Sequence, residues 1–388
     1  MSDPKVQVQN AVDAIRNELL EVSHWVHAHP EIAWQEFESS QYLATFLESH
    51  GFSVERKFVG LDTAFKATFG SGDLTIALCA EYDALPGLGH ACGHNIIASA
   101  SVGAALALKE VANDIDATIV VFGTPAEEGS GGKISMLSQN AFHGVDVAAL
   151  IHPGPVDVDH GDPFAVKHID VAYTGKASHA AAYPEHGVNA ADAFTIAQVA
   201  IGLLRQQLSP TVRVHGIVTR GGEAANAIPE RTEGRWYVRA NTLAQLDDIY
   251  QRVVKCFEAG AIATGCELHI EDDLNPYSEF TNHAQLTQRY RANAESLGRR
   301  FDAPEPATRM NRASTDMGNV SAVVASFHPY IGINSGTAVN HQHQFAAASI
   351  TPDADQAVID GAKGLAMTMV DVATDPVLRQ YVKEFSRS

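Results

Sequence analysis

The first part of the chain alternates between two hydrophobic periods, one typical of helices and one typical of strands. We expect helices at residues 7–28, 39–50, 96–111 and 132–139, and strands at residues 52–58, 63–69, 74–80, 117–122 and 147–151. Strands that alternate with helices in this way predict an α/β domain, with a mixed, mostly parallel sheet covered by helices on both faces. Sheets of this kind bind ligands at the loops that follow their strand ends.

The pattern changes after Pro163. The expected strands are then 165–173, 212–219, 231–239 and 267–271, and the expected helices are 189–207 and 243–259. The order β-α-β-β-α-β is that of a ferredoxin-like α+β domain. Helices at 284–296 and 353–372 complete the chain. We therefore predict a discontinuous catalytic domain of residues 1–164 and 275–388, with an inserted lid domain of residues 165–274.

Length and charge narrow the class of protein. A chain of 388 residues is too long for one compact core, which agrees with two domains. The formal charge of −19 disfavours nucleic acid and anionic membranes as partners, and a small-molecule substrate is expected instead. No apolar run is long enough to span a membrane, and the N-terminal residues do not resemble a secretory signal, so a cytoplasmic location is expected.

Candidate metal ligands follow several of the predicted strands. Cys92 and His94 stand on one loop, where a thiolate and an imidazole can both bind a zinc-like ion. Glu127 and Glu128 follow strand 117–122, so that one carboxylate can bind metal while its neighbour moves protons. His152 follows strand 147–151. Taken alone, Cys92 and His94 are equally well explained by a buried cysteine and a solvent-exposed histidine, the glutamate pair is better explained by a solvated acidic turn, and many histidines placed like His152 merely cap a turn. Their convergence on one edge of a sheet is what a metal site requires.

Two further histidines, His341 and His343, alternate along a segment that we expect to be nearly extended. On such a segment both side chains would point the same way, although a surface loop explains them nearly as well.

Several motifs, in order along nearly the whole chain, resemble the amidohydrolase branch of the metallopeptidase superfamily that contains aminoacylases and glutamate carboxypeptidases. Within that branch the chain is most similar to the group of β-alanyl-lysine dipeptidases and p-aminobenzoyl-glutamate hydrolases. The matching segments are His29-Pro30-Glu31 with Glu36, Tyr82 to Pro86, Ala91 to Asn95, Pro125 to Gly129, Gly175 to Ala180, Asn226 to Pro229 and Ser314 to Val320.

The resemblance implies a homodimeric hydrolase of a small N-acyl amino acid or dipeptide-like amide. It implies two divalent ions, zinc or manganese with cobalt as a further option, on the ligands Cys92, His94, Glu128, His152 and His341. Glu127 would be the general base and acid, and Asp83 would orient a ligand from behind. His179 would stabilise the oxyanion in its own or the partner subunit's site, and Asn226 and Arg239 would contact the substrate.

One departure from the superfamily pattern concerns Glu81, which stands where other members carry a metal-binding histidine. Cys92 would supply the missing ligand, which leaves the number and identity of the ions open. His343, His328 and His90 are the reserve candidates for the last ligand. Two rival interpretations also stay open: Cys92 as a nucleophile with His94 as its base, and a catalytically silent homologue that binds metal or an amino-acid conjugate.

Overall fold

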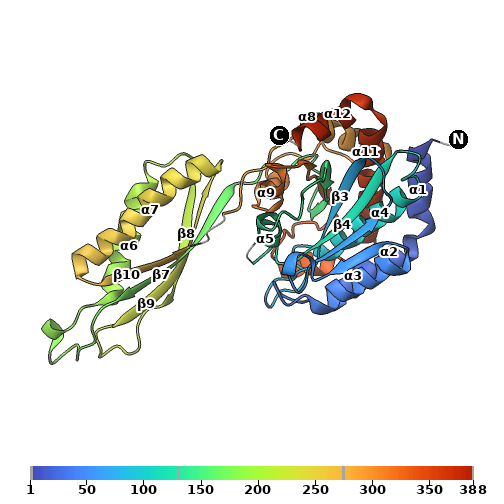
Figure 1. Ribbon diagram of the computed structural model, residues 1–388. Coiled ribbons are helices and arrows are strands. Elements are labelled where there is room, and N and C mark those ends of the chain that lie inside the picture. The colour runs from blue at the N-terminus through green and yellow to red at the C-terminus, as the bar shows by residue number, and fades with distance from the viewer. Residues whose placement is uncertain (1–2, 130, 273–275, 387–388) are drawn as a thin grey trace. The chain divides into compact units, whose positions relative to one another are not determined.

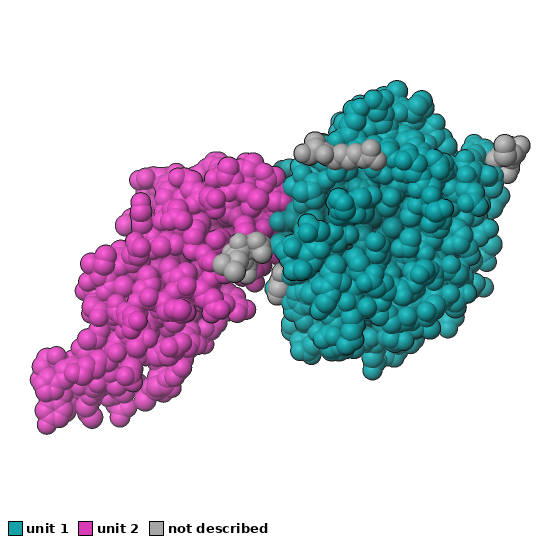
Figure 2. All heavy atoms as spheres, viewed as in Figure 1, with its two compact units in different colours: residues 1–162, 280–388 teal, residues 163–279 magenta. Residues whose placement is uncertain are grey.

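The computed structural model describes residues 3–129, 131–272 and 276–386 and divides into two compact units. Unit 1 contains Met1–Asp162 and Phe280–Ser388, and unit 2 contains Pro163–Glu279 (Figure 2). The domain boundary expected between residues 274 and 275 lies outside the described residues. Each unit has its own hydrophobic core, so each is described by itself.

Unit 1 is built on a six-stranded sheet with the order β1-β2-β4-β3-β5-β11 (Figure 1). Its strands are β1 (Ser53–Arg56), β2 (Phe65–Phe69), β3 (Leu74–Glu81), β4 (Ala117–Thr124), β5 (Val147–Ala149) and β11 (Ala325–Phe327). The neighbours β4 and β3, β3 and β5, and β5 and β11 run parallel, whereas β1 and β2 pair antiparallel to each other and β2 to β4. The predicted mixed, mostly parallel sheet is therefore confirmed. A separate short parallel pair joins β6 (His152–Gly154) to β12 (Tyr330–Gly332).

Helices cover both faces of this sheet because its central strands are apolar on both sides. In β3, Ile76 and Leu78 belong to one buried cluster, while Ala77 and Cys79 belong to another. The larger cluster packs against helices α1 (Pro4–Ala14), α2 (Arg16–Ala28), α3 (Phe37–Ser49), α4 (His94–Lys109), α8 (Ala284–Ser296), α11 (Pro352–Thr374) and α12 (Pro376–Phe385). The smaller cluster involves α5 (Gly132–Ser138) and α9 (Met317–Ser321). The remaining short helices are α10 (His343–Ala348), η1 (Phe58–Gly60), η2 (Pro184–His186) and η3 (Ala307–Arg312).

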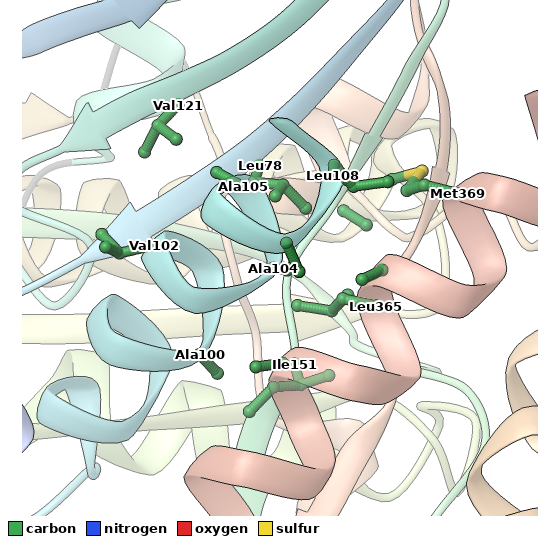
Figure 3. Packing of buried hydrophobic residues seen from close by; sticks show 14 of the residues in the cluster. Leu78, Ala100, Val102, Ala104, Ala105, Leu108, Val121, Ile151, Leu365 and Met369 are labelled. Atoms are coloured by element: carbon green, nitrogen blue, oxygen red, sulfur yellow. The ribbon is translucent and has the colours of Figure 1, made fainter. Parts of the chain in front are cut away.

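The central helix α4 is rich in small residues, which lets neighbouring elements approach it closely. Figure 3 shows Ala104 and Leu108 of α4 facing Leu365 and Met369 of α11, all of them buried. Within the described residues, no helix of the protein combines the length and the apolar character needed to cross a bilayer.

Unit 2 has the predicted β-α-β-β-α-β order. It consists of β7 (Ala165–Thr174), α6 (Ala190–Arg205), β8 (Arg213–Arg220), β9 (Arg231–Ala240), α7 (Leu243–Thr264) and β10 (Glu267–Asp272). The antiparallel sheet has the order β10-β7-β9-β8. One face packs on the helices: Trp236 of β9 lies 5.2 Å, ring centre to ring centre, from Phe194 of α6 and from Phe257 of α7. The other face carries the alternate, more polar positions of each strand.

Candidate metal centre

The candidate ligands gather where the parallel strands of unit 1 end. Strand β3 ends at Glu81, strand β4 ends at Thr124, and His152 opens the short strand β6 soon after β5. Because parallel neighbours present their carboxyl ends at the same edge, the loops that follow β3 and β4 lie side by side.

The loop from Cys92 to His94 is held by a glycine in a left-handed conformation. Gly93 has φ +79°, and a Cβ atom there would lie 2.4 Å from Cγ of Pro153. Both observations require glycine, since other residues rarely adopt this φ and have no room for a side chain. The tight turn places the Cys92 thiol and the first residue of α4, His94, on the same side of the site.

Three overlapping groups of side chains have the spacing that a metal ion requires. In each group the ligand atoms lie within 4.8 Å of one another: Cys92, His94 and His152; Cys92, Glu128 and His341; and Glu81, His94 and Glu127. The sulfur of Cys92 lies 3.6 Å from Nε2 of His152 and 3.6 Å from Nε2 of His341. These groups therefore bring together all five ligands expected from the resemblance.

Hydrogen bonds from behind the site orient two of the imidazoles. Nδ1 of His94 lies 3.0 Å from Oδ1 of Asp83, and Nδ1 of His152 lies 2.9 Å from the carbonyl oxygen of Pro153. In both cases Nδ1 is engaged by this contact, so Nε2 is the nitrogen that faces the site. The other oxygen of Asp83 accepts the backbone N–H of Glu128 at 2.9 Å. Asp83 thus links the loop after β3 to the loop after β4.

The buried atoms that face the site fit a cation. Nε2 of His94 and Oε1 of Glu128 are buried without a hydrogen-bond partner among the described residues. Nε2 of His94 has carboxylate oxygens of Glu81, Glu128 and Glu127 at 3.7, 3.8 and 3.9 Å. Buried polar atoms without partners are rare and costly, and carboxylates crowded around an imidazole need a positive charge. A thiolate, imidazoles and carboxylates together are a donor set suited to divalent metal ions.

The loop that carries Glu127 and Glu128 contains a residue other than glycine with a left-handed backbone conformation. Ala126 has φ +57°, which is unusual for a residue other than glycine. Its backbone N–H donates to Oε1 of Glu36 at 2.8 Å, from a carboxyl that is fully buried at the start of α3. Glu36 therefore holds the turn that directs Glu127 and Glu128 toward the site.

The charges within the site shift the pKa values of the two adjacent carboxyls, Glu127 and Glu128, in opposite directions. Burial raises the pKa of Glu128, but the neighbouring imidazoles of His341 and His94 outweigh burial and bring the pKa to about 2. Burial raises the pKa of Glu127 well above its usual value, and the charges of Glu81 and Glu128 add to the effect. Glu128 is thus held in the ionised form, the form that binds cations, whereas Glu127 has a greater affinity for a proton. Burial, with His328 nearby, lowers the pKa of His152 to about 3, so its imidazole is neutral, the form that binds metal.

The expectation for the two C-terminal histidines is wrong in its geometry. His341 adopts φ +69°, and His343 begins helix α10, so the segment is not extended and the two side chains are not equivalent. His341 joins Glu128 at 3.4 Å, whereas His343 is in none of the three groups. The reserve candidates His90 and His328 are buried near the site, and neither of their rings has a hydrogen-bond partner among the described residues. They also lie outside the three groups.

A buried lysine behind the site was not identified in the sequence. Nζ of Lys133, at the start of α5, lies 2.6 Å from Oε1 of Glu81 and 2.7 Å from Oδ1 of Asp316. All three side chains are fully buried. The sequence did draw attention to its two partners, because Asp316 lies in one of the motifs and Glu81 replaces an expected histidine. Lys133 itself is a single lysine in an ordinary helix, so no pattern marked it as their partner.

The three remaining candidates, His179, Asn226 and Arg239, all belong to unit 2. His179 is exposed, and its Nδ1 accepts the backbone N–H of Ala182 at 3.1 Å. Asn226 is exposed on a neighbouring turn, where its carbonyl oxygen accepts the N–H of Ala180 at 3.0 Å. The Arg239 side chain lies on β9, with Nε 3.4 Å from Nε2 of His215. His179 and Asn226 are therefore neighbours on adjoining turns, and Arg239 is on a strand of the same unit.

An α/β unit whose strand ends gather a thiol, imidazoles and carboxylates in this way has the architecture of a metal-dependent hydrolase. Residues 77–358 match peptidase family M20/M25/M40, and the chain belongs to this family. It is an enzyme that hydrolyses amide bonds of small substrates with the help of metal.

Among its relatives, the chain is 38% identical to the Xaa-Arg dipeptidase of Mus musculus, over 98% of this chain and 92% of the relative. It is 31% identical to a p-aminobenzoyl-glutamate hydrolase polypeptide of Escherichia coli (strain K12), over 74% of this chain and 64% of the relative. Similar solved structures support the fold. A putative aminohydrolase from methicillin resistant Staphylococcus aureus has a TM-score of 0.76 at 21% identity, covering 95% of this chain and 99% of that one. The YXEP protein of Bacillus subtilis, described as a dinuclear metal binding peptidase, has a TM-score of 0.70 at 22% identity, covering 93% and 99%.

Proposed function

We propose that the protein is a dipeptidase-like amidohydrolase that uses two divalent ions, zinc or manganese with cobalt as a further option, and Glu127 as its general base. The observation that carries the proposal is the convergence of Cys92, His94, Glu128, His152 and His341 in overlapping groups of ligand spacing. In this proposal those five side chains hold the ions. Cys92 belongs both to the group with His94 and His152 and to the group with Glu128 and His341.

The chemistry requires a stronger nucleophile than water and a better leaving group than an amide anion. Bound divalent ions supply Lewis acidity, which acidifies water and polarises the substrate carbonyl. Glu127 takes the proton of the attacking water and passes it to the departing amine. Its raised pKa suits both steps, since a carboxyl with an ordinary pKa would hold the proton too weakly to deliver it. Asp83 keeps His94 and the Glu128 loop in place during these steps.

Residues of unit 2 contact the substrate in this proposal. His179 donates to the oxyanion of the tetrahedral intermediate, in its own or the partner subunit's site, and its position beside Asn226 supports a shared role. Arg239 binds a substrate carboxylate, and Asn226 binds a carboxylate or carbonyl. The proposal also retains the domain division of residues 1–164 with 275–388 and 165–274, the latter acting as lid and dimerisation domain.

A homodimer formed through unit 2 is supported by its exposed apolar surface. Val199 and Leu203 lie one turn apart on α6 and are 59% and 60% exposed, and Ile217 on the edge strand β8 is 64% exposed. Edge strands and apolar helix faces of this kind favour association with a second copy.

A cytoplasmic location is supported by Cys92, because a ligand thiolate must remain reduced.

The rival in which Cys92 is a nucleophile is less well supported. Burial, with the charge of Glu128, raises the pKa of Cys92 well above its usual value, whereas nucleophilic cysteines have lowered pKa values. The interpretation as a silent homologue is disfavoured because Glu127, which binding alone does not need, is present.

A substrate panel tests the proposal. The names of the relatives suggest Xaa-Arg dipeptides and p-aminobenzoyl-glutamate, and N-acyl amino acids with other side chains extend the panel. The purified protein would be assayed with zinc, manganese and cobalt in turn. We expect turnover of at least one class, with dipeptides that end in a basic residue hydrolysed fastest, given the higher identity to the Xaa-Arg dipeptidase. Activity that is unchanged in metal-free protein would overturn the proposal.

A further inference from the structure

The buried cluster of Lys133, Glu81 and Asp316 has one atom that the cluster itself does not explain. Lys133 satisfies Oε1 of Glu81 at 2.6 Å, and Asp316 receives both Nζ and the backbone N–H of Lys133, at 2.7 and 2.8 Å. The second oxygen of Glu81, Oε2, is buried without a hydrogen-bond partner among the described residues.

The position of this oxygen points toward the metal centre. Oε2 of Glu81 lies 3.7 Å from Nε2 of His94, which is itself buried and unpartnered within the part of the chain that the structure describes. At 3.7 Å the two atoms are too far apart for a hydrogen bond, but two ligands of one ion are spaced in this way. Glu81, His94 and Glu127 form one of the three groups with ligand spacing.

The charges lead to the same conclusion. One lysine faces two carboxylates, so the cluster carries an excess negative charge in a place without solvent. Leaving a bare carboxylate oxygen in such a place is costly unless a cation or proton is near it. A purely structural ion cluster accounts for Lys133, Asp316 and Oε1 of Glu81, but it gives no partner to Oε2.

We infer that Glu81 is a further ligand of the metal centre and binds through Oε2 the ion that His94 binds. In this inference Lys133 is a positioning residue: by holding Oε1 it turns the carboxylate so that a single oxygen faces the ion. Asp316 in turn fixes Lys133 through two contacts. The inference rests on the proposed metal centre and adds a carboxylate to its expected ligands, which matters for metal choice because carboxylate oxygens favour manganese more than thiolates do.

Three variants test this. Glu81→Asp keeps the charge that pairs with Lys133 but withdraws the oxygens by one methylene. Glu81→Gln keeps the shape but removes the charge. Lys133→Met removes the positioning contact. Asp360→Asn is a matched control, since Asp360 is a largely buried carboxylate of unit 1 whose ion-pair partner, Arg299 at 2.9 Å, is outside the metal groups.

The readout is metal binding to apo-protein, measured by titration calorimetry with Mn²⁺ and by the visible absorption of bound Co²⁺. We expect Glu81→Asp and Glu81→Gln to lose one equivalent of ion at concentrations that saturate the wild type. The thiolate-to-cobalt absorption from Cys92 should remain, because its ion keeps other ligands. Lys133→Met should weaken one site by about 10–100-fold, as expected for a residue that acts through a ligand. Asp360→Asn should bind like the wild type.

The outcomes separate this inference from the proposed function. Wild-type protein that binds no ion would overturn the metal centre as a whole. Wild-type protein that binds ions while both Glu81 variants bind them equally well would overturn only the role of Glu81. If the variants fail to fold, anomalous diffraction from crystals of the wild-type holoprotein decides the question. An ion about 2.0–2.2 Å from Oε2 of Glu81 supports the inference, and a longer distance contradicts it.

Discussion

In unit 1 three of the five candidate ligands, Cys92, His94 and His152, are buried, whereas in unit 2 the candidate substrate contacts are exposed or half-buried. Nδ1 of His94 is held by Asp83, and both side chains are buried. His179 and Asn226 stand on exposed turns of unit 2. A metal centre needs fixed ligand positions before the ion arrives, so its residues are pre-organised by packing. Substrate contacts can be completed when the substrate binds, so they tolerate exposure.

Among the changes that test this comparison, removal of the metal should have the largest effect on turnover. Chelation should reduce turnover to background, because the buried groups of unit 1 act on the substrate only with their ions bound. Adding back zinc, manganese or cobalt should restore it, and metal analysis of the purified protein would give the number of ions. Full activity in protein shown to be free of metal would contradict the function of unit 1.

Glu127→Gln should have the next largest effect. Losing the general base should lower kcat by about 10²–10⁴-fold, while the bound metal stays the same. Steady-state kinetics and metal analysis of the same preparation provide the two measurements. The control is Glu258→Gln, an exposed glutamate on α7. Turnover at the wild-type rate would assign the base to another residue.

His179→Ala should lower kcat by about 10²–10³-fold if the imidazole stabilises the oxyanion. Mixed with Glu127→Gln subunits under conditions of verified exchange, the variant should regain part of the activity if His179 acts across a dimer interface. A loss of activity without any recovery would place His179 in its own subunit's site. Wild-type kcat in the single variant would remove it from the mechanism.

Arg239→Met should act mainly on substrate binding. A lost charge-assisted contact to a carboxylate is worth about 1.5–3 kcal/mol, so KM should rise by roughly 10–100-fold with a smaller change in kcat. The comparison that isolates the contact uses a substrate whose C-terminal carboxylate is amidated. The variant and the wild type should then differ little, and an equal loss on both substrates would mean that Arg239 has a structural role.

Glu36 should give the smallest effect, seen in stability rather than rate. Burial, and then the charge of Asp83, raises the pKa of Glu36 to about 7. Between pH 4.5 and 7 the unfolded chain loses this proton while the native chain keeps it, so native stability falls as the pH rises. Glu36→Gln should remove this pH dependence, so that the change in the free energy of unfolding between low and high pH becomes smaller by about 3 kcal/mol at most. Urea unfolding of chelated protein at pH 5 and pH 8 measures the difference, and parallel pH curves for both proteins would contradict it.

The order of elements and the two sheet types could be predicted from the sequence because they depend on local hydrophobic period. The short apolar run of residues 74–80 and the length of residues 284–296 each predict one element, and the structure has strand β3 and helix α8 there. Short or late elements were missed. Strands β11 and β12 have three residues each, too few for a period, and α12 begins at Pro376, just after α11 ends at Thr374.

The candidate ligands could also be predicted in kind, since parallel strands bring their following loops to one edge whatever the details of packing. Cys92, Glu128 and His152 were recognisable for that reason. Contacts between segments that no strand order connects were decided only by the tertiary structure. Lys133 meets Asp316 across 183 positions, and Glu36 meets Ala126 across 90. Such pairs depend on how whole helices and loops pack. Local pattern carries no record of that packing, so nothing in the order of residues indicated that one oxygen of Glu81 would be buried beside Nε2 of His94.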